Sequence, residues 1–352
     1  MINFAERLKA ARKMKGWSLD ELSKECGANV VSKQSLSKYE QGEMLPGDDI
    51  LYALCKALDI KTDYFNRRLS IRVKDVSFRK LESYSVAMQE KVISQTQDFL
   101  ERYLELEEIL GIDSKFNTKK FTGYKITCPD DVEDAAKNIR KAWKLGNDPL
   151  YNVVELLEDH HLKVVEVSDA DSFMGMSTLV MKKIPVIVLN NSEDIPNDRR
   201  RFTALHELGH IVMDLEHLSE NDQETYCHHF AGAMLITKDK LVEELGSERR
   251  KRIFISELGQ LKKQYGISIS ALLFRMADCK IIPKNTAFAM MGAMRRDGIF
   301  EKEPEEYDYQ GEEKSNRFLQ LLLRGVAMEL ISTSKGAALY NCKLSKFRAL
   351  LA

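Results

Sequence analysis

The chain has 352 residues, of which 44% are hydrophobic and 30% charged, a balance typical of a globular protein with two or three domains. Its 53 Lys and Arg residues nearly cancel its 54 Asp and Glu residues, which excludes a globally basic coat but not a local basic face. No apolar run approaches the ~18 residues that span a bilayer, and the charged N-terminus lacks the apolar segment of a signal peptide. Six cysteines without a Cys-x-x-Cys pair add to the prediction of a reduced, cytoplasmic protein with no membrane partner.

Residues 1–68 predict a domain made of short helices. The run Ser18-Leu19-Asp20-Glu21 is a capping-box pattern that opens a second helix, and Gly27 suits the end of that helix. A third helix is expected from Ser32 to Gln41, where Gly42 ends it. Two short helices joined by a tight turn predict a helix-turn-helix unit that reads DNA.

The third helix carries the side chains that such a unit uses. Gln can bond an adenine edge with two hydrogen bonds, and Lys can reach guanine or phosphate. A polar helix face is more often plain solvated surface, so the composition by itself is weak evidence. The candidate DNA contacts lie in the N-terminal half of the helix: Ser32, Lys33, Gln34, Ser35 and Lys38.

The order of residues over about 3–65 resembles the Xre family of phage-repressor-like helix-turn-helix regulators. The resemblance rests on RLKAARKMKGWSLDELSKECG and VSKQSLSKYEQGEMLPG. It implies that Ser32, Lys33, Gln34 and Lys38 contact bases or phosphates of double-stranded DNA. It also implies that Arg12 pairs with Glu40 to brace the recognition helix. The turn around Asn29 is longer than in the simplest phage repressors. Such domains usually bind as dimers to half-sites one helical turn apart.

Residues 69–128 predict a helical connector with one long helix at about 81–110. Apolar residues such as Met88, Val92, Phe99 and Leu106 recur in it at roughly seven-residue spacing. That spacing fits a helix packed within one chain and fits a dimerisation helix equally well.

From residue 129 the pattern changes to a mixture of helices and strands. Helices are expected near 130–144 and 149–160, and again from about 198 onward. Strands rich in Val and Ile are expected at Leu162–Val167, Gly175–Met181 and Pro185–Leu189, and the second could bind a peptide substrate by strand addition. Residues 283–352 predict a further helical subdomain, in which Ile331–Leu339 has the pattern of a small helix-turn-helix-like cap. The basic run Arg249–Arg252 is most simply a solvated helix face.

The run His206-Glu207-Leu208-Gly209-His210 predicts a metal site. Two histidines four residues apart share one helix face and can converge on a single Zn²⁺. Glu207 lies beside that pair, where a carboxylate can accept a proton from an activated water. A catalytic zinc takes a third protein ligand, and Glu224 is the best candidate because it opens the next helical run. His228, one turn later, could orient a ligand or be one itself.

The residues from about 130 to 282 resemble the ImmA/IrrE metallopeptidase family, on the strength of RFTALHELGHIVM, Glu224-x-x-Cys227-x-x-Phe-Ala and SELGQLKKQYGISISALLFRM. Members are zinc endopeptidases, and several cut Xre-type repressors. The resemblance implies zinc ligands at His206, His210 and Glu224, and a general base at Glu207. The family commonly has Ala followed by Asn or Asp where this chain has Cys227 and His228.

The sequence therefore predicts a multidomain protein. We expect an all-α helix-turn-helix domain (1–68), a helical connector that could mediate dimerisation (69–128), an α+β zincin-like metallopeptidase domain (129–282) and a helical C-terminal subdomain (283–352). The predicted function is a DNA-binding regulator, a homodimer, that cleaves a repressor-type protein or its own 66–80 linker. The alternatives are a transcription factor whose peptidase-like domain is a non-hydrolytic sensor, and an antitoxin-like autorepressor.

Overall fold

The computed structural model describes residues 2–27, 29–66, 84–113, 115–116, 121–168, 173–180, 183–246, 253–300 and 302–352. Within them the chain divides into two compact units. The first unit combines residues 1–114 with 316–352 and a short segment at 179–182, and the second comprises 115–178 and 183–315. Three predictions lie outside the described residues: the 69–80 linker, the basic run 249–252, and the first residues of the long helix at 81–83. No described helix is both long and apolar enough to cross a bilayer.

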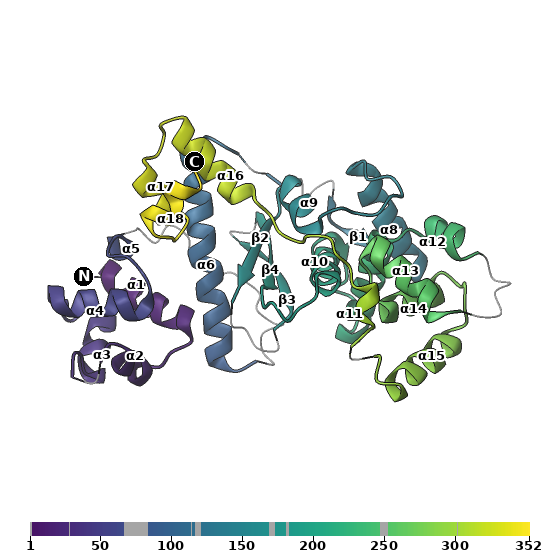
Figure 1. The fold of residues 1–352 in the computed structure, drawn as a ribbon, viewed down its shortest axis with the longest axis horizontal. Coiled ribbons are helices and arrows are strands. Elements are labelled where there is room, and N and C mark those ends of the chain that lie inside the picture. The colour runs from purple at the N-terminus through teal and green to yellow at the C-terminus, as the bar shows by residue number, and fades with distance from the viewer. Residues whose placement is uncertain are drawn as a thin grey trace. The chain divides into compact units, whose positions relative to one another are not determined.

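Apart from the short segment at 179–182, the first unit is all-α (Figure 1). We call residues 2–66 the head; its small core is formed by leucines such as Leu8, Leu22, Leu36 and Leu54. One change from the second unit to the first falls after Ser315, inside the predicted C-terminal subdomain. The bounds of the four predicted domains stay predictions. The helices of this unit are α1 (Ile2–Lys15), α2 (Leu19–Glu25), α3 (Lys33–Gln41), α4 (Asp48–Leu58), α5 (Asp63–Asn66), α6 (Val86–Ile109), α16 (Arg317–Ala327), α17 (Thr333–Leu339) and α18 (Leu344–Ala349).

Local sequence signals set the ends of the head helices as predicted. Ser18 and Glu21 form the reciprocal capping box of α2, because the hydroxyl accepts from the Glu21 N–H and the carboxylate accepts from the Ser18 N–H. Ser32 caps α3 by accepting from the Ser35 N–H at 3.1 Å. Gly42 ends α3 with a φ of 74°, a conformation that glycine adopts without the steric cost of a side chain.

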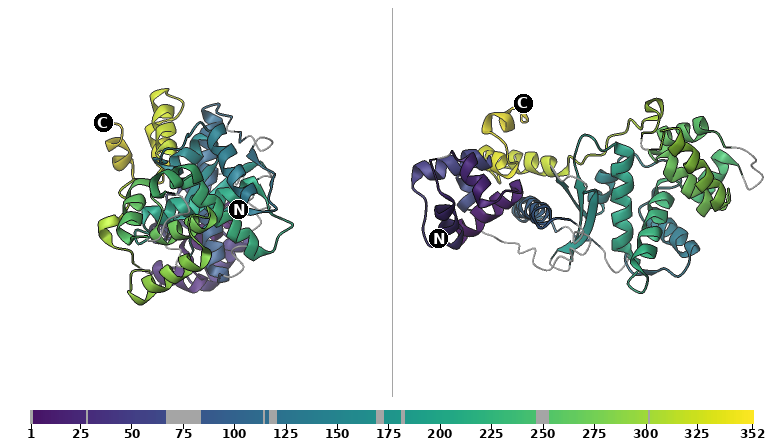
Figure 2. Two further views of the ribbon diagram at one scale, coloured as in Figure 1. Left: turned by 90° about the vertical axis from the view of Figure 1, so that its right-hand side faces the viewer. Right: turned by 90° about the horizontal axis from the view of Figure 1, so that it is seen from below.

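The long helix α6 packs within its own chain (Figure 2). On one side it meets α1, where the buried Arg7 donates to Glu101 at 2.6 Å and Gln95 donates to the Met14 carbonyl oxygen at 3.0 Å. On another side Tyr103 stacks on Phe318 of α16, with ring centroids 5.2 Å apart. These contacts account for the apolar spacing within one chain, and a dimer formed through α6 stays a prediction.

The second unit combines helices with two small sheets, so the predicted combination of all-α and α+β folds is confirmed. Three strands form a sheet in the order β2-β4-β3, in which β2 and β4 are parallel and Lys163 pairs with Val186; β1 and β5 form a separate parallel pair that the sequence did not predict. The strands are β1 (Tyr124–Lys125), β2 (Lys163–Val167), β3 (Gly175–Val180), β4 (Ile184–Asn190) and β5 (Met213–Asp214).

Helices α9 and α10 pack against this sheet, and the helices of the unit build the largest hydrophobic core, which includes Trp143, Leu205, Phe230 and Leu272. Element ends shift by a few residues from the predicted ones where a cap decides them; Asn152, for example, delays the start of α9. The helices are α8 (Pro129–Ala142), α9 (Val153–Asp159), α10 (Asn197–Val212), α11 (Glu220–Leu235), α12 (Lys238–Leu245), α13 (Ile255–Tyr265), α14 (Ile269–Asp278), α15 (Lys284–Arg296) and the 3₁₀ turn η3 (Glu305–Tyr307).

A buried ion-pair cluster fixes α11 against α8 and α14. Glu133 of α8 accepts from both terminal nitrogens of Arg275 and from His229 Nε2, the last at 2.6 Å. Arg275 also donates through Nε to the Ile236 carbonyl oxygen at 3.1 Å. Burial raises the pKa of Glu133, but the hydrogen bonds from His229 and Arg275 outweigh it and lower that pKa to about 2.

Removing the carboxylate of the Arg7–Glu101 pair should destabilise the first unit. Both side chains are buried, and burial raises the pKa of Glu101 in spite of its partner. The attraction between the two charges therefore does little more than offset the cost of removing them from water. Glu101→Ala strands a buried guanidinium and should lower the free energy of unfolding by about 3–5 kcal/mol. Urea denaturation measures the change, with Glu108→Ala at an exposed position of the same helix as the control. Equal stabilities of the two variants would contradict this account.

The Glu133 cluster predicts a pH-dependent contribution to stability. Because the pKa falls from 4.5 in the unfolded chain to about 2 in the folded one, the charged carboxylate stabilises the fold above about pH 4.5 and this is lost as the pH falls toward about 2. Glu133→Gln should therefore lower the free energy of unfolding by about 3 kcal/mol at pH 7, and by less at pH 3. Urea titrations at both pH values test it, with the exposed Asp134→Asn as control. A deficit that does not shrink at pH 3 would argue against this assignment.

Candidate metal centre and nucleic-acid interface

The helix α10 presents the His-Glu-x-x-His run from a well-packed support. Leu205, Leu208 and Val212 on its inner face are fully buried in the core of the second unit. His206 and His210 lie one turn apart on another face, as the 3.6-residue period of a helix requires. The imidazoles are thus held by a rigid element, because the apolar face of the same helix is fixed.

The second helix of the site, α11, crosses α10 at close range. Ser219 caps α11 by accepting from the Asp222 N–H at 3.2 Å, which sets the start of the helix one turn before Glu224. A side chain at Gly209 would bring a Cβ atom to 3.2 Å from Phe230 and 3.3 Å from the Cys227 sulfur, both on α11 and fully buried. The glycine therefore permits the helices to approach, and Cys227 is part of their apolar contact.

This crossing brings three predicted residues together. The His206 Nε2 atom lies 3.0 Å from one oxygen of Glu224, and the His210 Nε2 atom lies 3.2 Å from the other. The two Nε2 atoms lie 3.2 Å from each other. The histidines are mostly buried, while 45% of the Glu224 side chain is exposed, so the group is open on the carboxylate side.

These separations fit a bound divalent ion. Zn–N and Zn–O bonds of about 2.0–2.1 Å in tetrahedral geometry put neighbouring donors about 3.3 Å apart. The two Nε2 atoms are 3.2 Å apart, close to that value, and each lies at 3.0 or 3.2 Å from its own oxygen of the Glu224 carboxylate. Two imidazoles and one carboxylate are also a donor set typical of catalytic zinc. The residues present therefore fit a metal ion of the zinc type.

The predicted base, Glu207, is buried next to this cluster and has a partner that the sequence did not reveal. Ser177 of β3 donates a hydrogen bond from its hydroxyl to Glu207 Oε2 at 2.8 Å. The strand can come this close because Gly175 has no side chain: a Cβ atom there would lie 2.6 Å from the Thr203 methyl group of α10. The only sequence signal for this contact was the pair of small residues, Gly175 and Ser177, in a predicted strand. No periodic pattern links them with Glu207, so the contact could not be predicted.

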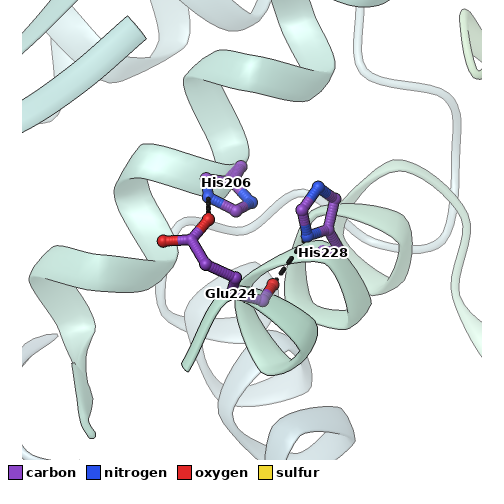
Figure 3. A group of neighbouring side chains, drawn as sticks. All are labelled: His206, Glu224 and His228. Atoms are coloured by element: carbon purple, nitrogen blue, oxygen red, sulfur yellow. Dashed lines mark hydrogen bonds and ion pairs between the residues drawn. The ribbon is translucent and has the colours of Figure 1, made fainter. Parts of the chain in front are cut away.

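His228 lies beside the cluster, on the same face of α11 as Glu224 (Figure 3). Its Nδ1 atom is 2.6 Å from the Glu224 carbonyl oxygen, and its ring centroid is 4.4 Å from that of His206. A carbonyl only accepts, so Nδ1 carries the proton and the lone pair of a neutral ring is on Nε2. Ligand-type atoms of His206, Glu224 and His228 all lie within 4.8 Å of one another.

The candidate DNA contacts lie on the outer side of α3 in the head. Ser32, Lys33, Gln34 and Lys38 are exposed, and Ser35 is half-buried. Two of the residues also have local roles, since Ser32 caps the helix and Lys33 donates to Asp20 at 2.6 Å. The Lys33–Asp20 pair is more than half exposed, and such pairs contribute about 0–1 kcal/mol, so Lys33 can leave it for a phosphate.

A second ion pair holds the recognition helix in place. Arg12 of α1 donates from Nε and Nη2 to the two oxygens of Glu40, each at 2.7 Å, and from Nη1 to the Trp17 carbonyl oxygen. The hydrogen bonds that Arg12 donates to Glu40 raise the pKa of Arg12, so the guanidinium stays charged at physiological pH. The bidentate geometry fixes the orientation of α3 relative to α1.

Comparisons with known proteins agree with this arrangement. A family model described as a helix-turn-helix matches residues 8–65. A second model, from the M78 peptidase family and described as the IrrE N-terminal-like domain, matches residues 158–277, which include the metal cluster. A search of curated proteins gave no match. The chain is thus a fusion of an Xre-type helix-turn-helix domain with a metallopeptidase-like domain of the ImmA/IrrE family.

Proposed function

We propose that this chain is a DNA-binding transcriptional regulator with zinc-dependent endopeptidase activity. The observation that carries the proposal is the convergence of His206, His210 and Glu224 at 3.0–3.2 Å, with Glu207 following His206 directly on the same helix. The proposed substrate is a repressor-type protein or the chain's own 66–80 linker. In this proposal the two histidines and Glu224 hold Zn²⁺, because their atoms have the separations of tetrahedral zinc ligands.

A zinc ion held by these residues would supply Lewis acidity, which activates water and polarises a peptide carbonyl group. Glu207 then acts as general base: it accepts a proton from the attacking water and passes it to the leaving amine nitrogen. Ser177 donates a hydrogen bond to Glu207 Oε2, which helps to orient the carboxylate for this proton transfer. Ser177 is therefore a positioning residue in this proposal.

The head supplies the DNA-binding part of the function. We propose that Gln34 and Lys38 contact base edges, and that Ser32, Lys33 and Ser35 contact phosphates or bases at the start of α3. Regulators of this kind usually bind two half-sites about one helical turn apart, so two copies are proposed to act together.

Replacing the proposed base should abolish cleavage while leaving metal binding intact. Glu207→Gln keeps the shape and the hydrogen bond from Ser177 but cannot accept the proton, so turnover should fall at least a hundredfold. The zinc-loaded protein is incubated with Xre-type repressors encoded beside its gene, and cleavage of the repressor and of the chain itself is followed by intact mass. Zinc content is measured on the same samples, and Glu216→Gln at an exposed position serves as control.

Two results would count against the proposal. Cleavage that survives in Glu207→Gln would remove this residue from the reaction. Stoichiometric zinc with no turnover of any repressor, together with DNA affinity that depends on zinc, would favour the sensor instead.

The proposed role of His228 is to support the ligands from the side. Its Nδ1–H is held by the Glu224 carbonyl oxygen and its ring lies against His206, so its loss should loosen both ligands. His228→Ala should weaken zinc affinity about 10–100-fold while the three ligands remain. Competition with a chromophoric chelator measures the affinity, and the visible spectrum of the cobalt-substituted protein reports the coordination number. His217→Ala at an exposed site is the control; a changed coordination number would make His228 a ligand.

A further inference from the structure

The last two helices of the first unit form a second helix-turn-helix. The first of them, α17, ends in a left-handed turn: Asn341 has a φ of 54°, and the Cys342 N–H donates to the Ala337 carbonyl oxygen at 3.0 Å. Lys343 is then extended and precedes α18 directly. A turn of three to four residues between two short crossing helices is the defining connection of a helix-turn-helix.

The same elements occur in the head. Both α2 and α17 have seven residues, and each is capped by a serine hydroxyl that accepts from the N–H three residues later, Ser18 in one case and Ser332 in the other. Each helix is followed by a residue in the left-handed conformation, and a small residue stands four positions before that one. These are Ser23 before Gly27, with a φ of 106°, and Ala337 before Asn341. The C-terminal pair is thus built like the DNA-binding pair, with a shorter turn.

The two C-terminal helices cross closely. Phe347 of α18 is fully buried, and a Cβ atom at Gly336 of α17 would lie 2.6 Å from its ring. One face of α18 is therefore fixed against α17. Lys346 and Arg348 lie on the two sides of Phe347, Lys343 is the N-cap residue of α18, and all three side chains are exposed.

The charge of this segment differs from that of the whole chain. Residues 330–352 contain four basic residues and no Asp or Glu, whereas the complete chain has a net charge of −1. Lys335 pairs with Glu105 of α6. Lys343, Lys346 and Arg348 form no ion pair within the described part of the chain, and their side chains are exposed to solvent.

The turn of this pair is joined to the head. Lys61, between α4 and α5, donates to the Cys342 carbonyl oxygen at 2.7 Å. Arg102 of α6 donates to the Leu339 carbonyl oxygen at 2.8 Å, so both the head and the long helix hold α17–α18. When the head binds DNA, the basic helix of the same compact unit is brought close to the phosphates of that DNA.

We propose that α17–α18 is a second DNA-contacting surface, in which Lys343, Lys346 and Arg348 bind phosphates of duplex DNA. Lys and Arg contacts to phosphates position a protein on DNA without reading sequence, which suits a six-residue helix that lacks Gln and Asn. The surface is independent of the peptidase activity. It would add sequence-independent affinity to the contacts made by α3.

The test measures how affinity for DNA depends on salt. Each lost phosphate contact lowers the slope of log K against log salt by about 0.9, so Lys343→Ala/Lys346→Ala/Arg348→Ala should lower it by about 2.7. Fluorescence anisotropy of the full chain on a labelled 40-base-pair duplex of mixed sequence gives the slope. The matched control removes three exposed lysines of the second unit, Lys137→Ala/Lys141→Ala/Lys263→Ala, and should leave the slope unchanged.

A head variant separates the two surfaces. Lys33→Ala/Gln34→Ala/Lys38→Ala should leave the contribution of α18 in place, and the combined variant should lose both. Thermal unfolding is measured alongside, and all the variants should keep the melting temperature because every replaced side chain is exposed. The proposal is overturned if the α18 variant has the slope of the unmodified chain, if the second-unit control loses as much, or if the unmodified chain does not bind the duplex at low salt.

Discussion

The candidate metal site depends on how closely two helices can cross. His206 and His210 are placed by the period of α10, but they meet Glu224 only because α11 lies against the same helix at Gly209. Glycine inside a helix costs about 1 kcal/mol relative to alanine. That cost is offset here by the contact of Phe230 and Cys227 with the bare backbone, which any larger side chain would push away.

The same principle recurs on the other side of α10. Gly175 lets the strand β3 approach the helix, and this approach puts the Ser177 hydroxyl on the Glu207 carboxylate. Gly209 and Gly175 therefore allow Glu224 and Ser177, respectively, to reach the His-Glu-x-x-His run. The buried Glu133–Arg275–His229 cluster then fixes the orientation of α11. Its three members belong to three different helices, α8, α14 and α11, and are joined by hydrogen bonds.

The first unit shows how a DNA-binding head can be joined to distant parts of the chain. The long helix α6 meets the head through Arg7 and Glu101, and meets the C-terminal helices through Tyr103 and Phe318. Residues more than 200 positions apart thus belong to one compact body.

Sequence alone determined the features that depend on neighbours along the chain. The capping box at Ser18, the cap at Ser32, the stop at Gly42 and the one-turn spacing of His206 and His210 are set by hydrogen bonds and helix period within a few residues. The pairing of Arg12 with Glu40 was implied by family resemblance. Tertiary structure decided the contacts that link distant elements: Ser177 with Glu207, the intrachain packing of α6, and the placement of α16–α18 beside the head. No local pattern encodes these, because which surfaces meet depends on the complementary shapes and charges of whole elements, and periodicity specifies only which face of an element is apolar.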